Sequence, residues 1–160
     1  MRALFWMLLA VSGSVLAQAA DTTQVQVNGK LVTPPCRPGF ATSMNVKLEE
    51  VSVRQLLDGD ARVTEVPLTF DCRPDSRVSL VLSAGLGSID TQTLRTSREN
   101  LGLRLMGVDG KPGISLGQTS SWTVGNDPLQ LTLRVRPVSL GELPEAGAFS
   151  ATLLMQILYL

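Results

Sequence analysis

The sequence predicts an all-β fold, an antiparallel sandwich of short strands. Three observations favour this fold. Apolar residues recur at every second position in several segments, turn residues separate those segments, and helical patterning is almost absent. About 140 residues remain after a predicted leader, enough for one domain with a proper core. No internal repeat or second domain is indicated.

Residues 1–20 have the pattern of a cleaved signal peptide. A positive start at Met1 and Arg2 precedes an apolar run over residues 3–16, and small residues at 17 and 19 fit a cleavage site after Ala19 or Ala20. A membrane anchor is the weaker alternative, because the run is short for a bilayer span and polar sequence follows it. We therefore expect an exported protein.

Charge and cysteine content narrow the function classes. Without Arg2 the chain has thirteen basic and fourteen acidic residues in no blocks of one sign, which argues against nucleic acid as the partner. Cys36 and Cys72 are an even pair in an exported chain, which predicts one disulfide. A metal pair or reactive thiols are poorer explanations, because the sequence has no histidine and no CxxC.

The first mature residues alternate like a strand that stands apart from the domain. One face of residues 21–31 is predicted to carry the following side chains: Thr23, Val25, Val27, Gly29 and Leu31. Pro34 and Pro35 then interrupt pairing, because proline has no N–H to donate to a ladder. The pattern predicts a detached strand on a stiff joint.

The remaining elements follow in order along the chain. Residues 40–57 are ambiguous and are interpreted as a strand running into a short helical or irregular piece, and residues 85–99 as a loop. Strands are predicted over 62–72, 77–83, 101–106, 114–116, 120–124 and 129–135, with a hairpin turn at Asp109–Gly110. This succession is typical of an immunoglobulin-like sandwich.

The last fourteen residues are predicted to form the most apolar strand. One face carries Gly147, Phe149, Ala151, Leu153, Met155, Ile157 and Tyr159. The other face is mixed and ends on Leu158 and Leu160. Chain ends are commonly polar and frayed, so such a strand is expected inside a sheet with a neighbour on each side.

Catalysis has little support in the residues present. Without histidine there is no Ser-His-Asp triad and no imidazole metal site, and the acidic pairs at 49–50 and at 58 and 60 are interpreted as a solvated edge and a turn. We expect no enzyme activity, cofactor or metal. A sugar-binding site would need a free aromatic platform, and only Trp122 is a candidate for one.

The detached N-terminal strand and the apolar C-terminal strand could pair with each other if they came from different molecules. If the N-terminal strand of one copy lay beside the C-terminal strand of the next, the contact would not close on itself and a fibre would result.

These features resemble the pilin subunits of chaperone–usher fimbriae, in particular the minor adaptor subunits of P and type 1 pili. Four features carry the resemblance. They are Gly147 fourteen positions from the end with the penultimate Tyr159, residues 25–36 up to the first cysteine, residues 66–72 up to the second, and the hairpin region 101–116.

The resemblance implies an incomplete immunoglobulin-like sandwich that lacks its last strand, with a groove beside residues 147–160. It implies a division into a signal peptide (1–20), a donor-strand extension (21–33) and a pilin domain (34–160). It further implies that a periplasmic chaperone fills the groove and holds the carboxylate of Leu160. At an outer-membrane usher, a neighbouring pilin's extension would then replace the chaperone, with Val25, Val27 and Leu31 in pockets and Gly29 over a shallow point.

The role implied is a minor or adaptor subunit of a cell-surface fimbria that contributes to adhesion. A major rod subunit, a terminator and a self-contained secreted sugar-binding sandwich stay as alternatives. The sequence departs from the resemblance in one respect, because Leu154, Leu158 and Leu160 make the outward face of the last strand apolar as well.

Overall fold

The structure is a computed structural model that describes residues 24–31, 33–109 and 111–159. The chain divides into two units, Met1–Val32 and Thr33–Leu160. The predicted signal peptide lies outside the described residues. In the first unit, residues 24–31 have no strand or helix and their side chains are exposed, so the predicted strand is not formed there.

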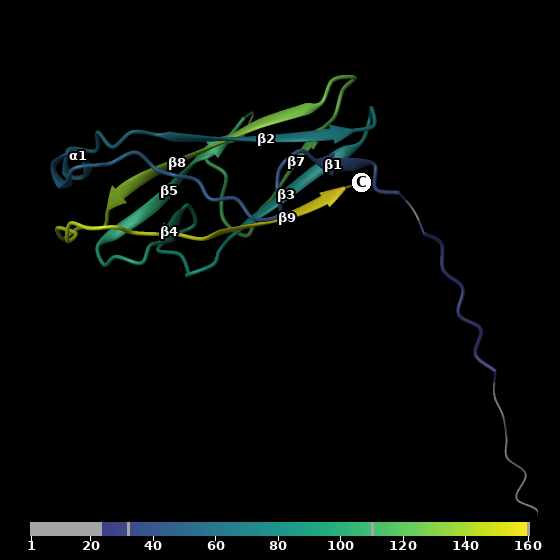
Figure 1. The fold of residues 1–160 in the computed structure, drawn as a ribbon, viewed down its shortest axis with the longest axis horizontal. Helices are drawn as coiled ribbons and strands as arrows, with labels where there is room; N and C mark the ends of the chain where they lie inside the picture. Colours follow the sequence, from purple (N-terminus) through teal and green to yellow (C-terminus); the bar gives the residue numbers. More distant parts are fainter. Residues whose placement is uncertain (1–23, 32, 110, 160) are drawn as a thin grey trace, which may run out of the picture. The chain divides into compact units, whose positions relative to one another are not determined.

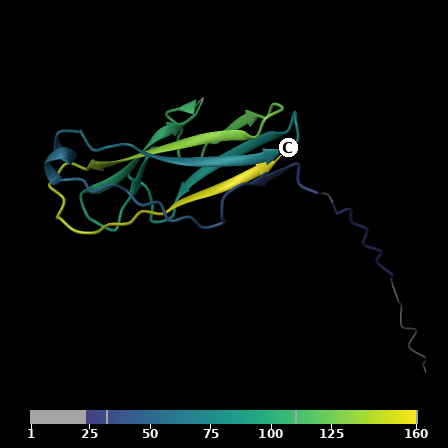
Figure 2. The same cartoon turned by 45° about the horizontal axis from the view of Figure 1, so that its top comes forward.

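The second unit consists of two antiparallel sheets (Figure 1). The larger sheet contains β1 (Cys36–Pro38), β2 (Thr64–Cys72), β8 (Leu129–Ser139), β5 (Leu101–Val108) and β4 (Thr93–Arg95) in that order, with β6 (Lys111–Pro112) paired to β5. The smaller sheet has the order β7 (Thr119–Thr123), β3 (Arg77–Ala84) and β9 (Leu153–Tyr159). The described helix is α1 (Val53–Leu57). Figure 2 shows the same elements in a tilted view. The predicted all-β sandwich is confirmed.

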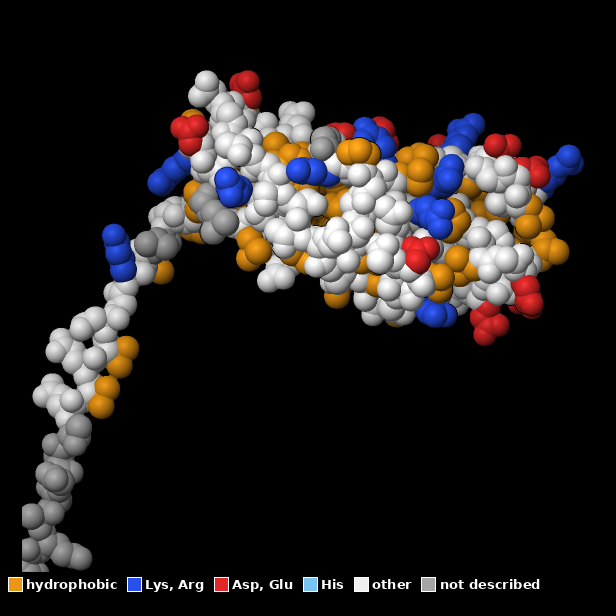
Figure 3. Space-filling model, turned by 180° about the vertical axis from the view of Figure 1, so that it is seen from behind, with side chains coloured by type: hydrophobic (Ala, Val, Ile, Leu, Met, Phe, Trp, Pro, Cys, Tyr) orange, Lys and Arg blue, Asp and Glu red, His pale blue; other side chains and the backbone are white. Residues whose placement is uncertain are grey.

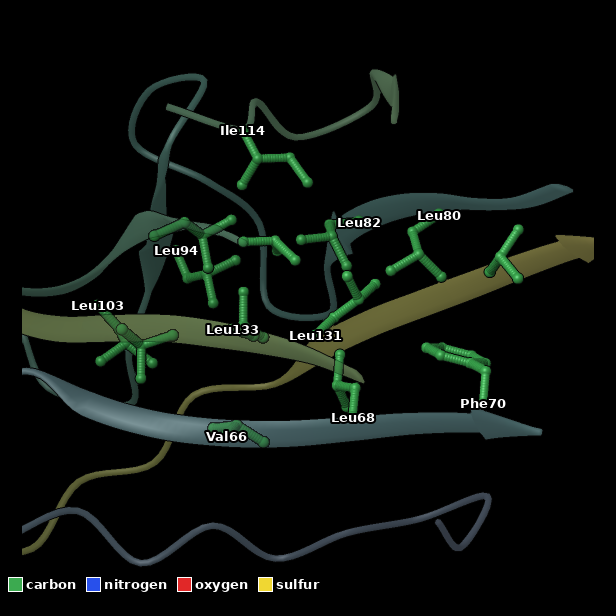
Figure 4. Packing of buried hydrophobic residues seen from close by; sticks show 14 of the residues in the cluster. Val66, Leu68, Phe70, Leu80, Leu82, Leu94, Leu103, Ile114, Leu131 and Leu133 are labelled. Atoms are coloured by element: carbon green, nitrogen blue, oxygen red, sulfur yellow. The ribbon is translucent and has the colours of Figure 1, made fainter. Parts of the chain in front are cut away.

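Alternate residues of the facing strands fill the space between the sheets. Leu68 and Phe70 of β2, Leu80 and Leu82 of β3 and Leu131 of β8 are all buried and point toward one another (Figure 4). The period of two in the sequence arises because successive strand side chains point to opposite faces, so one set of each strand enters this core.

One edge of the larger sheet is only partly covered. β1 pairs with the last three residues of β2, from Phe70 to Cys72, and leaves the earlier part of β2 without that neighbour. Pro67 lies in this part, opposite Thr132 of β8. The Thr132 N–H is donated to Asp109 Oδ2 at 2.8 Å, so it makes no bond to β2, and the Pro67 nitrogen faces the free edge.

The predicted disulfide is present between Cys36 and Cys72, which are paired across β1 and β2. Between them the chain passes through α1, whose capping box is formed by Ser52 and Gln55. Leu56 is the buried residue of α1, and it packs with Ala61 and Leu101 in a small second cluster. The disulfide therefore closes a loop that contains α1 and residues 39–51.

Several predicted strands need correction. No strand forms over 40–51, the predicted return strand at 114–116 is replaced by β6 immediately after the turn, and β4 lies in a stretch expected to be a loop. The last strand begins at Leu153, so Gly147, Phe149 and Ala151 precede it. Among the described residues β9 pairs only with β3, so the prediction of a neighbour on each side is wrong for this chain alone.

Candidate functional site: an apolar groove beside the last strand

A groove with a volume of about 1180 Å³ opens between the two sheets beside β9. Its floor is made of core side chains from the larger sheet: Val66, Leu68, Leu94, Leu103, Leu133 and Val135. One wall is formed by residues within 38–51 and the other by residues within 147–157. The groove thus reaches the residues that hold the sandwich together.

The wall formed by residues within 147–157, called the first wall below, is the terminal segment with β9. Leu153, Met155, Ile157 and Tyr159 are half-buried and pack on the core, whereas Leu154 and Leu158 are 52% and 42% exposed. The predicted two faces of this strand are therefore confirmed. β9 is bonded to β3 in the register Leu153↔Ala84 to Tyr159↔Val78, and within the described residues its other edge has no strand beside it.

The second wall is the irregular segment over residues 40–51. Phe40 contacts Phe70 edge to face with ring centroids 5.3 Å apart, and Leu48 also packs against the core. Met44 and Val46 are 41% and 44% exposed. In the part of the chain that the structure describes, the main chain of 40–51 makes no backbone hydrogen bond. Both walls therefore present backbone groups that have no protein partner.

This second wall was missed as a site by the sequence reasoning. The signal for it is the alternation of Val46 and Leu48, which predicts a strand, and Met44 continues the same alternation. The alternation marks side chains that line the groove without strand pairing.

The terminal segment before β9 is held to the neighbouring loops by individual hydrogen bonds. The Gly85 N–H donates to the Thr152 carbonyl at 2.9 Å, and the Ser97 N–H donates to the Ser150 carbonyl at 2.8 Å. Arg98 Nε donates to the Ala148 carbonyl at 3.1 Å. Phe149 packs against the cluster around Leu56 and Leu101.

Gly147 begins this segment in a conformation that glycine favours, with φ of 145°. The guanidinium of Arg98 lies directly against it, so a Cβ at this position would overlap with the arginine. Glycine is favoured at position 147 by its φ, and a larger residue there would also have to displace the end of the Arg98 side chain.

The structure brings together most of the predicted acceptor residues, and the described donor residues are exposed. Gly147, Phe149, Ala151, Leu153, Met155 and Ile157 line the groove, and Tyr159 packs on the core at the end of β9. Val25, Val27 and Leu31 are 79%, 88% and 101% exposed, and no other atom lies within 4 Å of a Cβ placed on Gly29. Thr23 and Leu160 lie outside the described residues.

The groove offers few groups for acid–base chemistry. Its charged lining residues lie on the second wall, where Glu49 accepts a hydrogen bond from Arg62 at 2.9 Å. Burial raises the pKa of Tyr159 above its ordinary value of 10.0, so its phenol does not serve as a base at neutral pH. Over the described ranges, no group of three or more His, Cys, Asp or Glu residues is arranged to hold a metal ion.

Basic and acidic side chains are interspersed on the face shown in Figure 3. Among the residues that the structure describes, no helix is both long and apolar enough to cross a membrane.

The fold and the groove together define a pilin-type sandwich that is short of one strand. Comparison with protein families agrees, because the family model described as fimbrial protein matches residues 25–159. The chain therefore belongs to the fimbrial proteins, and the predicted location, in a fimbria on the bacterial cell surface after export through the periplasm, is confirmed.

Solved structures show the same fold. The P pilus rod subunit PapA has a TM-score of 0.63 and 18% identity, over 79% of this chain and 99% of that chain. A structure of a chaperone–usher pilus that concerns rod uncoiling has a TM-score of 0.61 and 16% identity, over 93% of this chain and 100% of that chain. The search of curated proteins gave no match.

Proposed function

We propose that this chain is a minor adaptor subunit of a chaperone–usher fimbria that polymerises by donor-strand exchange and contributes to cell adhesion. The observation that carries the proposal is that one chain contains both an open apolar groove and an exposed segment of alternating apolar residues. Addition of a strand to a free sheet edge is a general mode of recognition, in which main-chain bonds give affinity and side-chain pockets give specificity.

The acceptor half of the joint is the groove. An incoming strand would find the free edge of β9 on one side and the unbonded main chain of residues 40–51 on the other. Its apolar side chains would cover core residues such as Leu68 and Leu133. Chaperone and neighbouring pilin would use this same groove in turn.

The donor half is the extension at residues 21–33. Val25, Val27 and Leu31 are fully or almost fully exposed, so each has most of its apolar surface available for burial in a neighbour's groove. Complete burial of one such side chain contributes about 1.5–3 kcal/mol. Residues 34–160 would form the pilin domain. The periplasmic chaperone would hold the carboxylate of Leu160 until the subunit reaches the outer-membrane usher.

An adaptor or rod position is favoured over a terminator, because the groove is open along β9 and would accept a further subunit.

The sugar-binding alternative has less support. The indole of Trp122 donates to the Asp109 carbonyl at 2.9 Å and its ring packs against the core, so it is not a free platform.

Co-expression tests the proposal directly. The exported chain should co-purify from the periplasm with a pilus chaperone, and a variant lacking residues 21–31 should still do so while failing to insert into a neighbouring subunit. A stable monomer that needs no chaperone would contradict the groove assignment. Polymerisation of the shortened variant as a donor would contradict the extension assignment.

A further inference from the structure

The acceptor edge extends beyond β9 as defined by its pairing with β3. Residues 148–152 have no strand partner, yet three of their carbonyl groups are bonded on the side away from the groove. The acceptors are the carbonyls of Ala148, Ser150 and Thr152, and the donors belong to Arg98, Ser97 and Gly85.

The direction of these carbonyls fixes the direction of the neighbouring amides. No peptide bond described in the chain is cis, and in a trans peptide the N–H points opposite to the preceding carbonyl. The N–H groups of Phe149, Ala151 and Leu153 therefore point toward the groove that these residues line. Ser150 N–H is donated to Ser97 Oγ at 2.9 Å, which turns the Phe149 carbonyl toward the groove as well.

This is the alternation of a β-strand edge, with discrete loop groups in place of a neighbouring strand. Gly85 permits the arrangement because a Cβ there would lie 2.7 Å from the Thr152 side chain. In Figure 1 the yellow trace that leads into β9 runs past β4, which Ser97 and Arg98 follow closely in the chain, whereas Gly85 directly follows β3.

We propose that Arg98 is a positioning residue of the acceptor groove, which with Ser97 and Gly85 extends the pairing edge from Leu153 back to Phe149. This inference rests on the proposed donor-strand exchange. The extended edge, residues 149–159, has eleven residues, and so does the donor segment 21–31. β9 alone has seven and would leave one end of the donor unpaired on this side.

Arg98 has the largest part in this arrangement. Its guanidinium packs on Gly147, donates to Ala148 and lies 3.7 Å from a carboxylate oxygen of Glu145. Arg98→Ala removes the bond that orients the first peptide of the edge. Because Arg98 takes no part in the pairing of β9 with β3, the substitution should leave that register unchanged.

The test compares donor peptides of different length on the mature chain held by its periplasmic chaperone. The probes are a labelled peptide of residues 21–31 and two shortened forms, one without 21–23 and one without 29–31, with uptake followed by fluorescence anisotropy. For the full peptide, Arg98→Ala should lower affinity about tenfold, the size of one oriented hydrogen bond to a charged donor.

The shortened peptides distinguish positioning from general damage. The peptide that no longer reaches Phe149 should bind the wild type and Arg98→Ala equally, and which truncation has this effect gives the direction of the donor relative to β9. Ser97→Ala should give the same pattern with a smaller change. An equal loss for all three peptides, or no loss for any, would overturn the inference.

Two controls isolate the bond. Arg54→Ala removes an arginine whose side chain is 91% exposed and paired with Asp58, away from the groove lining, and should change nothing. Glu145→Gln removes only the longer ion pair with Arg98 and should also bind normally. If the wild type accepted no donor at all, neither a peptide of any length nor the extension of a co-expressed pilin, the proposed function itself would be wrong, and the inference would fall with it.

Discussion

At the scale of single residues, Asp109 connects the two sheets. Its carboxylate accepts hydrogen bonds from Arg134 and from the Thr132 N–H, each at 2.8 Å, and its carbonyl accepts the Trp122 indole from β7. The bond from Arg134, followed by the one from Thr132, lowers the pKa of Asp109 below its ordinary 3.8.

This shift gives a prediction for acid stability. The pKa of Asp109 is lower in the folded state than in the unfolded state. Between these two pKa values the unfolded state therefore binds more protons than the folded state. The stabilisation by Asp109 is present above the ordinary value and is lost as pH falls through the folded pKa. Asp109→Asn should therefore flatten the fall in the free energy of unfolding below about pH 4, measured in denaturant with the groove filled by donor peptide.

Asp71→Asn is the matched control, because Asp71 is exposed and makes no ion pair within the described residues. Its acid profile should follow the wild type. An Asp109→Asn profile as steep as that of the wild type would disprove the role of this carboxylate.

The sequence predicted part of this arrangement. Asp109–Gly110 was recognisable as a turn from local chemistry alone. Its bonds to Trp122, Thr132 and Arg134 depend on strands that lie 13 to 25 residues further along the chain, and no local pattern encodes such partners.

At the scale of elements, the proposed donor-strand exchange requires that the extension and a neighbour's groove match in register. Gly29 is the small residue in a series of apolar ones, and the implied pairing places it over a shallow part of the neighbour's groove. A larger side chain there would have to displace packed core atoms, and overpacking of this kind costs about 1–3 kcal/mol.

Gly29→Leu should therefore slow donor-strand exchange about tenfold or more, measured as the rate at which the extension peptide displaces chaperone. Asn28→Leu is the matched control. It adds the same side chain at the neighbouring position, on the opposite face of an extended strand, and should exchange at the normal rate. Equal rates for Gly29→Leu and the wild type would contradict the assigned register.

Strands that bury one face in the core were predicted well from the sequence. β2, β3, β5 and β8 have clear alternation because each has one side in the core. Residues 147–160 were predicted as one strand although only Leu153–Tyr159 is paired. The alternation in 147–152 reflects the groove that the segment lines, and the sequence does not reveal that its other side is bonded to loop residues.

At the scale of the whole molecule, the disulfide controls one wall of the groove. Cys36 and Cys72 are 36 positions apart, and the loop between them contains residues 40–51, which have no backbone hydrogen bonds of their own in the described structure. Closing a loop of this length stabilises a fold by roughly 3–4 kcal/mol on the chain-entropy model.

The double variant Cys36→Ser, Cys72→Ser should therefore lose about 3–4 kcal/mol in its free energy of unfolding, measured in denaturant with donor peptide bound. Reduction of the wild type should give the same value. A loss below about 1 kcal/mol would mean that the loop is held by its packing on the core and not by the covalent closure.

The position of Pro67 has a consequence for how many partners one subunit can take. Its nitrogen faces the part of the β2 edge that β1 leaves uncovered, and proline cannot donate a hydrogen bond there. Sideways growth of the larger sheet is blocked at the edge nearest the groove. In the proposed assembly each subunit makes two joints, one through its groove and one through its extension, and units with two joints form threads, whereas strand addition at the β2 edge would allow branching into a network.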